Sequence, residues 1–76
     1  MKSTNKRAND MVELLFISYR MGGVNQARRA LKQLKKQNYN QHIARNFKWL
    51  SETKTDEEFQ TRIEKTIEVW NDPKNN

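Results

Sequence analysis

Apolar residues recur along this chain with the three- and four-residue spacing of amphipathic helices. The spacing predicts four helices, at residues 9–21, 24–37, 41–53 and 56–71. The chain contains only two glycines and one proline, and no segment shows the alternation of apolar and polar residues that marks a strand. We therefore predict an all-α fold, a small bundle of three to four helices.

Turn and capping residues indicate where these helices end. Gly22 suits the left-handed backbone conformation that closes many helices, so it predicts the end of the first one. Asn38–Asn40 predict a polar turn, and Thr55 followed by Glu58 forms a capping box at the start of the last helix. The helices are thus expected to be joined by short connections.

The length of the chain limits its organisation. A chain of 76 residues can bury one small core, so we expect a single helical domain over residues 9–71. Residues 1–8 and 72–76 are expected to be flexible tails.

The last three predicted helices are each apolar on one face, which predicts a core between them. The predicted core positions in these helices are Val24, Ala27, Leu31, Leu34, Ile43, Phe47, Leu50, Phe59, Ile63, Ile67 and Trp70. Trp49 lies beside the stripe of its own helix. It is interpreted either as a cover for the edge of the core or as a contact for a partner.

The first predicted helix is apolar on two opposite faces. One face carries a broad set of core candidates around Leu15, and the other carries Leu14, Ile17 and Met21. Either the remaining helices surround this helix, or the second face binds another copy or a partner. The candidate oligomer or partner interface comprises Leu14, Ile17, Met21 and Trp49.

The net charge of +6 conceals an uneven distribution along the chain. Residues 1–48 hold eleven Lys and Arg and only two acidic residues, whereas residues 49–76 hold four basic and seven acidic ones. No acidic residue occurs between Glu13 and Glu52. This block favours a polyanionic partner, of which nucleic acid is the commonest, over a basic surface that is merely solvated.

Residues 9–37 have the order of a helix-turn-helix, with glycines at the corner between two helices. In that arrangement the second helix lies in the DNA major groove, where amide and guanidinium side chains read base edges and lysines contact phosphates. The candidate nucleic-acid-binding residues are Asn25, Gln26, Arg28, Arg29, Lys32, Lys35, Lys36, Arg45 and Lys48.

The sequence offers little support for catalysis or for a metal or cofactor site. The chain has no cysteine and one histidine, His42, and its acidic residues lack the close loop spacing of a calcium site. We expect a protein that is not an enzyme. The absence of cysteine favours the cytoplasm, and no apolar stretch is long enough to cross a membrane.

Three hypotheses follow for the basic region. The first is a small regulatory protein that binds DNA, in preference to RNA, through its second helix and acts as a homodimer. The second is an interaction module or inhibitor that binds an acidic surface of a larger nucleic-acid-handling protein. In the third, the acidic edge of the last helix folds over the basic edge of the second helix, so that the charges are satisfied internally.

Overall fold

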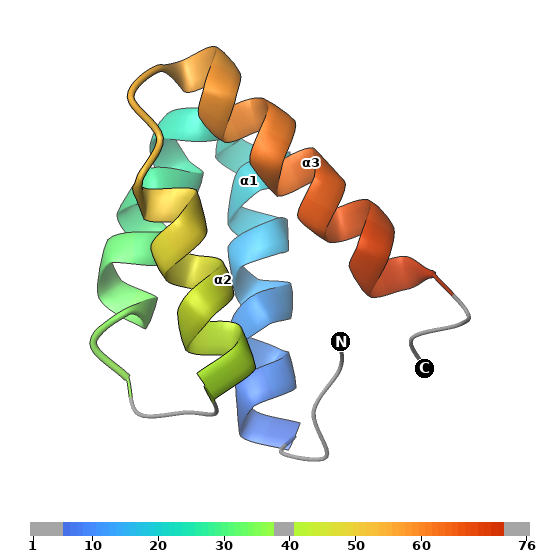
Figure 1. The fold of residues 1–76 in the computed structure, drawn as a ribbon. Helices are drawn as coiled ribbons and strands as arrows, with labels where there is room; N and C mark the ends of the chain where they lie inside the picture. Colours follow the sequence, from blue (N-terminus) through green and yellow to red (C-terminus); the bar gives the residue numbers. More distant parts are fainter. Residues whose placement is uncertain (1–5, 38–40, 73–76) are drawn as a thin grey trace.

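The computed structural model describes residues 6–37 and 41–72, and these residues form three helices (Figure 1). Helix α1 spans Lys6–Leu34, α2 spans Gln41–Ser51 and α3 spans Asp56–Asn71. Each helix packs against the other two, and the described residues contain no strand. The predicted all-α bundle is confirmed.

Helix α1 is divided into two arms by a break in its helical conformation at Gly23. We call residues 6–22 the first arm and residues 24–34 the second arm. Figure 1 shows that the arms run in opposite directions, with the reversal in the cyan part of the helix. The first two predicted helices therefore exist, but a single residue separates them.

The two glycines at this break have different roles. Gly23 has φ 73° and ψ −161°, a backbone region that is essentially restricted to glycine. Gly22 has no positive φ, so its predicted role as a left-handed cap was wrong. Its role is steric, because a Cβ atom at Gly22 would lie 2.4 Å from the Cβ of Gln26. The reversal therefore needs glycine at both positions.

The other helix ends agree with the sequence to within a few residues. Helix α1 begins at Lys6, inside the segment predicted to be a tail, and the buried Ala8 explains the extra turn. The second arm ends at Leu34 and is followed by turn residues, and α2 ends at Ser51. The predicted turn at Asn38–Asn40 and most of the predicted tails lie outside the described residues.

The predicted capping signal at the start of α3 is confirmed. The Thr55 side-chain oxygen accepts a hydrogen bond from the Glu58 backbone N–H at 3.1 Å. The Glu58 carboxylate in turn accepts from the Lys54 backbone N–H at 3.4 Å, one residue earlier than in the usual reciprocal box. These contacts satisfy backbone donors that a helix N-terminus would otherwise leave unpaired.

The core lies where both arms of α1 meet α2 and α3. Phe16 and Trp70 pack edge to face, with ring centres 6.0 Å apart and an interplanar angle of 80°. Of the core positions predicted in the last three helices, only Val24 and Ile67 remain partly exposed. The buried apolar residues are Ala8, Val12, Leu15, Phe16, Ala27, Leu31, Leu34, Ile43, Phe47, Leu50, Phe59, Ile63 and Trp70.

Candidate nucleic-acid interface

Arg28 differs from the other basic residues of the second arm because it holds the start of α3. Its Nε atom lies 3.3 Å from the Asp56 carboxylate, and its Nη2 donates to the Thr55 backbone carbonyl at 2.9 Å. The guanidinium also lies over the Phe59 ring, 4.5 Å from the ring centre. Arg28 therefore joins the second arm to α3, a role that the sequence analysis did not anticipate.

Lys35 connects the end of α1 with the end of α2. Its Nζ donates to the Ser51 hydroxyl at 3.1 Å, and that hydroxyl donates to the Lys48 backbone carbonyl at 2.7 Å. A cation at this place is favourable, because the last carbonyls of a helix carry partial negative charge. These contacts place the end of the second arm beside the end of α2.

An exposed basic surface spans the second arm, the turn that follows it and α2. We call it the basic face, and it comprises Arg29, Lys32, Lys35, Lys36 and Lys48. All five residues are exposed. Among the ion pairs formed between described residues, none includes a member of this face. Its charge is therefore available to a partner.

Part of this face forms a regular stripe. Asn25, Arg29, Lys32 and Lys36 follow one another at intervals of four, three and four residues, which places them along one side of the second arm and its last turn. Gln26 is also exposed and lies against Gly22 at the reversal. Asn25, Arg29, Lys32 and Lys36 thus share one side of the second arm, whereas Lys35 lies beside Lys32 and Arg28 near Ser51 of α2.

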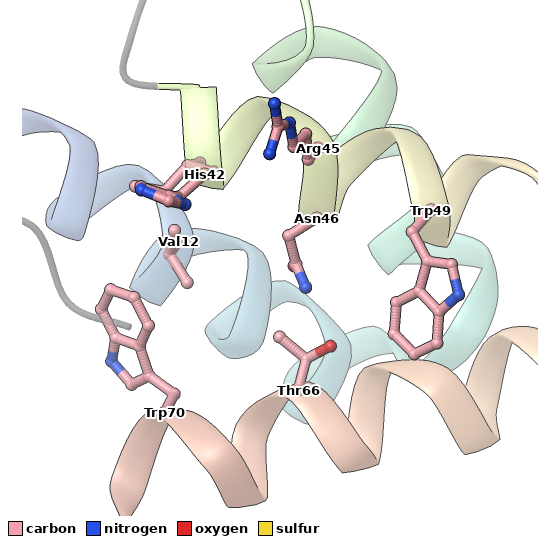
Figure 2. Close-up of a pocket in the computed structure, with 8 residues that line it drawn as sticks. Val12, His42, Arg45, Asn46, Trp49, Thr66 and Trp70 are labelled. Atoms are coloured by element: carbon pink, nitrogen blue, oxygen red, sulfur yellow. The ribbon is translucent and has the colours of Figure 1, made fainter. Parts of the chain in front are cut away.

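Arg45 belongs to a different surface, a groove between α2 and α3. We call it the α2–α3 groove, and it encloses a volume of about 560 Å³. Figure 2 shows seven labelled residues of this groove, with Trp49 and Trp70 at opposite ends and Asn46 between them. The residues that line it are Val12, His42, Ile43, Arg45, Asn46, Trp49, Thr66 and Trp70. None of them is acidic.

Trp49 is held in the wall of this groove by Arg62. The Arg62 guanidinium lies 4.9 Å from the centre of the Trp49 ring and donates to the Trp49 backbone carbonyl at 2.6 Å. Arg62 also pairs with Glu58 at 3.0 Å. The residue nevertheless remains 41% exposed, so part of its surface is accessible to a partner.

The second apolar face of the first arm is exposed to solvent. Leu14, Ile17 and Met21 are 52%, 47% and 83% exposed, and we call these three residues the apolar strip. The alternative in which the other helices surround this part of the chain is wrong. Trp49, predicted as part of the same interface, lies on α2 and lines the groove instead.

The acidic residues of α3 do not cover the basic face. Glu64 lies close enough to Tyr19 of the first arm for its negative charge to raise the pKa of the phenol, and Glu68 approaches Lys65 of its own helix at 4.0 Å. Between the second arm and α3, Arg28 and Asp56 form the one ion pair among the described residues. The internal account of the basic charge therefore applies to Arg28 and does not extend to the basic face.

Comparisons with known proteins give no functional assignment: no family model, curated protein or solved structure matches the chain. None of the helices within residues 6–37 and 41–72 has the length and apolarity needed to cross a membrane. Within the same residues, no three histidine or acidic side chains come together as a metal site would require.

Proposed function

We propose that this chain is a small DNA-binding protein that contacts duplex DNA through the second arm of α1. The observation that carries the proposal is the exposed stripe of Asn25, Arg29, Lys32 and Lys36, which has no acidic partner among the described residues. Lys35 and Lys48 extend its positive charge toward α2. Such a surface attracts the phosphates of nucleic acid and steers their approach.

A helix of this kind matches the dimensions of the DNA major groove, which accommodates one α-helix. Asn25 and Arg29 carry the side-chain groups that bind adenine and guanine edges through two hydrogen bonds. Lys32 and Lys36 follow on the same stripe and would contact phosphates. In this proposal the first arm lies behind the inserted second arm, and the single-residue reversal at Gly23 takes the place of the longer turn of a helix-turn-helix.

We propose further that the chain acts as a homodimer in a regulatory role. The apolar strip supports this part of the proposal, because small proteins seldom leave contiguous apolar side chains in water. Two copies joined through a two-fold axis would present two second arms to two half-sites of one duplex.

The experiment that tests the DNA proposal compares two triple variants with the same loss of charge. Arg29→Ala, Lys32→Ala and Lys36→Ala remove the stripe, whereas Arg20→Ala, Lys54→Ala and Lys65→Ala remove exposed bases elsewhere. Affinity for a random duplex is measured by fluorescence anisotropy, and circular dichroism checks that both variants remain helical.

We expect the stripe variant to lose at least about tenfold in affinity and the control variant to lose much less, because contacts to phosphates supply most non-specific binding. Equal losses in both variants would show that only the net charge matters and would overturn the proposed interface. Repeating the titration with duplex RNA tests the expected preference for DNA.

A second candidate function is favoured by the exposure of Met21 and its neighbours in the apolar strip. In this alternative the chain binds an acidic surface of a larger nucleic-acid-handling protein, with the strip as the apolar part of the contact. It predicts that the unmodified chain fails to bind duplex DNA or RNA even at low salt. Binding at low salt that disappears in the stripe variant favours the DNA proposal instead.

A further inference from the structure

The α2–α3 groove has the size and lining of a site for a small molecule. Its volume of about 560 Å³ falls within the range of about 300–1,000 Å³ found for ligand pockets. Apolar side chains from all three helices contribute, with Val12 from α1, Ile43 from α2 and Trp70 from α3. The groove is therefore a feature of the assembled fold.

The exposed indole of Trp49 favours a flat aromatic ligand. Figure 2 shows Trp49 and Trp70 at opposite ends of the groove with Asn46 between them, and because Trp70 is only 2% exposed, Trp49 is the indole that a ligand can cover. One side of the Trp49 ring is already covered by Arg62 at 4.9 Å, yet 41% of the residue is still exposed. Aromatic rings that pack against an indole gain from offset or edge-to-face contacts in addition to the area they bury.

Polar groups in the middle of the groove can orient such a ligand. Asn46 points into the space between the indoles, opposite Thr66 of α3 (Figure 2). Its amide can donate and accept hydrogen bonds. Thr66 is buried, and its hydroxyl donates to the Arg62 backbone carbonyl at 2.9 Å, so Asn46 is the more accessible polar group of the two.

The charge of the groove favours a ligand with an acidic group. Arg45 and His42 line it from neighbouring positions on α2, and no carboxylate is among the lining residues. Arg45 is exposed at the outer edge and forms no ion pair with another described residue. An anion held there would meet one permanent positive charge and no nearby repulsion from the lining residues.

We infer that the α2–α3 groove binds a flat aromatic molecule that carries a carboxylate or phosphate group. The ring packs against Trp49, Asn46 orients it, and its anionic group faces Arg45. The basic face contributes no residue to the groove, so this inference stands independently of the proposed DNA binding.

The test uses the only two tryptophans of the chain, both of which line the groove. Their two indole N–H signals are followed by ¹H–¹⁵N NMR during titration with 2-naphthoate, which is flat and anionic. Matched probes are 2-naphthalenemethanol, which lacks the charge, and cyclohexanecarboxylate, which lacks the flat ring. Adenosine monophosphate tests whether a nucleotide can supply the same chemistry as an aromatic carboxylate.

We expect a saturable shift of the Trp49 indole signal with 2-naphthoate, a smaller change at the buried Trp70, and weaker binding of the two matched probes. Arg45→Gln should weaken 2-naphthoate binding about two- to fivefold, as for a solvent-exposed charge pair, and leave 2-naphthalenemethanol binding unchanged. Arg20→Gln removes an exposed arginine outside the groove and should change neither affinity.

A second variant tests the location of the site. Asn46→Phe places a ring in the middle of the groove and should abolish the shifts, whereas Asn46→Ala leaves the space open and should retain them. The absence of saturable shifts in the unmodified chain would overturn the inference. Equal affinity for all three probes, or full binding by a folded Asn46→Phe variant, would do so as well.

Discussion

The guanidinium of Arg28 lies over the ring of Phe59, 4.5 Å from its centre, and fixes the second arm of α1 to the first turn of α3. The same side chain reaches the Asp56 carboxylate and the Thr55 carbonyl. A residue that the sequence predicted as a reader of DNA bases therefore has a structural role. Because substitution of Arg28 would change stability and DNA binding together, the stripe variant keeps Arg28.

The contacts of Arg28 predict a measurable loss of stability on its removal. Arg28→Ala should lower the free energy of unfolding by about 1–2 kcal/mol, because a cation–π contact and a hydrogen bond from a charged donor are lost together. The stability of Arg28→Lys should lie between that of the unmodified chain and that of Arg28→Ala, since lysine keeps the charge but lacks the planar guanidinium. Urea unfolding followed by circular dichroism provides the measurement.

Arg29→Ala is the matched control for this prediction, because Arg29 is the next residue along the chain and is exposed. Its effect should stay within about 0.5 kcal/mol, as for most surface substitutions. If the Arg28 and Arg29 variants unfold at the same urea concentration, the contacts of Arg28 with α3 do not stabilise the fold.

The backbone of Gly23 predicts opposite effects for the two mirror forms of alanine. Its φ of 73° and ψ of −161° disfavour an L-residue, so Gly23→Ala should destabilise the chain by about 1–3 kcal/mol. For a D-residue the mirrored angles correspond to the extended region that L-residues readily adopt. Gly23→D-Ala should therefore be neutral or stabilise by up to about 1 kcal/mol, because it restricts the unfolded chain.

Both forms are accessible by chemical synthesis, and thermal unfolding compares them at identical composition. The space around Gly23 is open, since an L-Cβ there would meet nothing within 4 Å, so a loss in the L-form would come from the backbone. Equal stability of the L- and D-forms would contradict the positive φ at this position.

The raised pKa of Tyr19 predicts that the protein becomes less stable at high pH. Burial, together with the charge of Glu64 and the hydrogen bond to its carboxylate, raises the pKa of Tyr19 above its ordinary value, while a hydrogen bond to Gln60 acts in the opposite direction. A raised pKa in the folded state means that the protonated phenol is favoured by folding. The stabilisation is complete below about pH 10 and is lost as the pH rises through the folded-state pKa.

The phenolate absorbance of Tyr19 can be measured alone in a Tyr39→Phe background, because the chain contains two tyrosines. Glu64→Gln should lower the pKa of Tyr19 relative to this background, since it removes a negative charge beside the phenol. Glu68→Gln is the control, because Glu68 pairs with Lys65 on the same helix. A Tyr19 titration that is the same in all three proteins would rule out the contact with Glu64.

The helices and most of the core could be predicted from the sequence, because they depend on local periodicity and capping. Thr55 illustrates this, since the residue that predicted a cap accepts the expected hydrogen bond. The different roles of Arg28, which contacts α3, and Arg29, which is exposed, could not be predicted in the same way. Arg28 lies near the edge of the apolar stripe, but its partner Phe59 is supplied by packing between distant segments.

The α2–α3 groove also depends on packing between distant segments, so the sequence predicted only part of it. The sequence placed Trp49 beside the apolar stripe of its own helix, which suggested a surface beside the core. Val12 and Thr66 complete the groove from the other two helices, and Thr66 is a polar residue that the apolar pattern did not include. A site shared by three helices becomes visible only when their packing is known.

The apolar strip predicts that the chain self-associates. Sedimentation equilibrium at about 100 µM should show a dimer, and Ile17→Glu should shift it to a monomer because a charge would be buried in the contact. Gln41→Glu adds the same charge at an exposed position on α2 and should leave the dimer intact. A monomeric unmodified chain, with or without DNA, would remove the homodimer from the proposed function.

The basic face predicts how DNA binding depends on salt. Each neutralised phosphate contributes about −0.9 to the slope of log affinity against log salt, so phosphate contacts from the four lysines of this face predict a slope of about −3.6 per chain. Lys36→Ala should reduce the magnitude of this slope by about 0.9, because it removes one contact. Lys65→Ala should leave the slope unchanged, since Lys65 lies on α3 near Glu68.

Slopes measured by anisotropy between 50 and 200 mM salt, a range over which such contacts dominate, distinguish this face from a diffuse positive charge. If Lys36→Ala and Lys65→Ala change the slope equally, the five residues do not form the DNA contact.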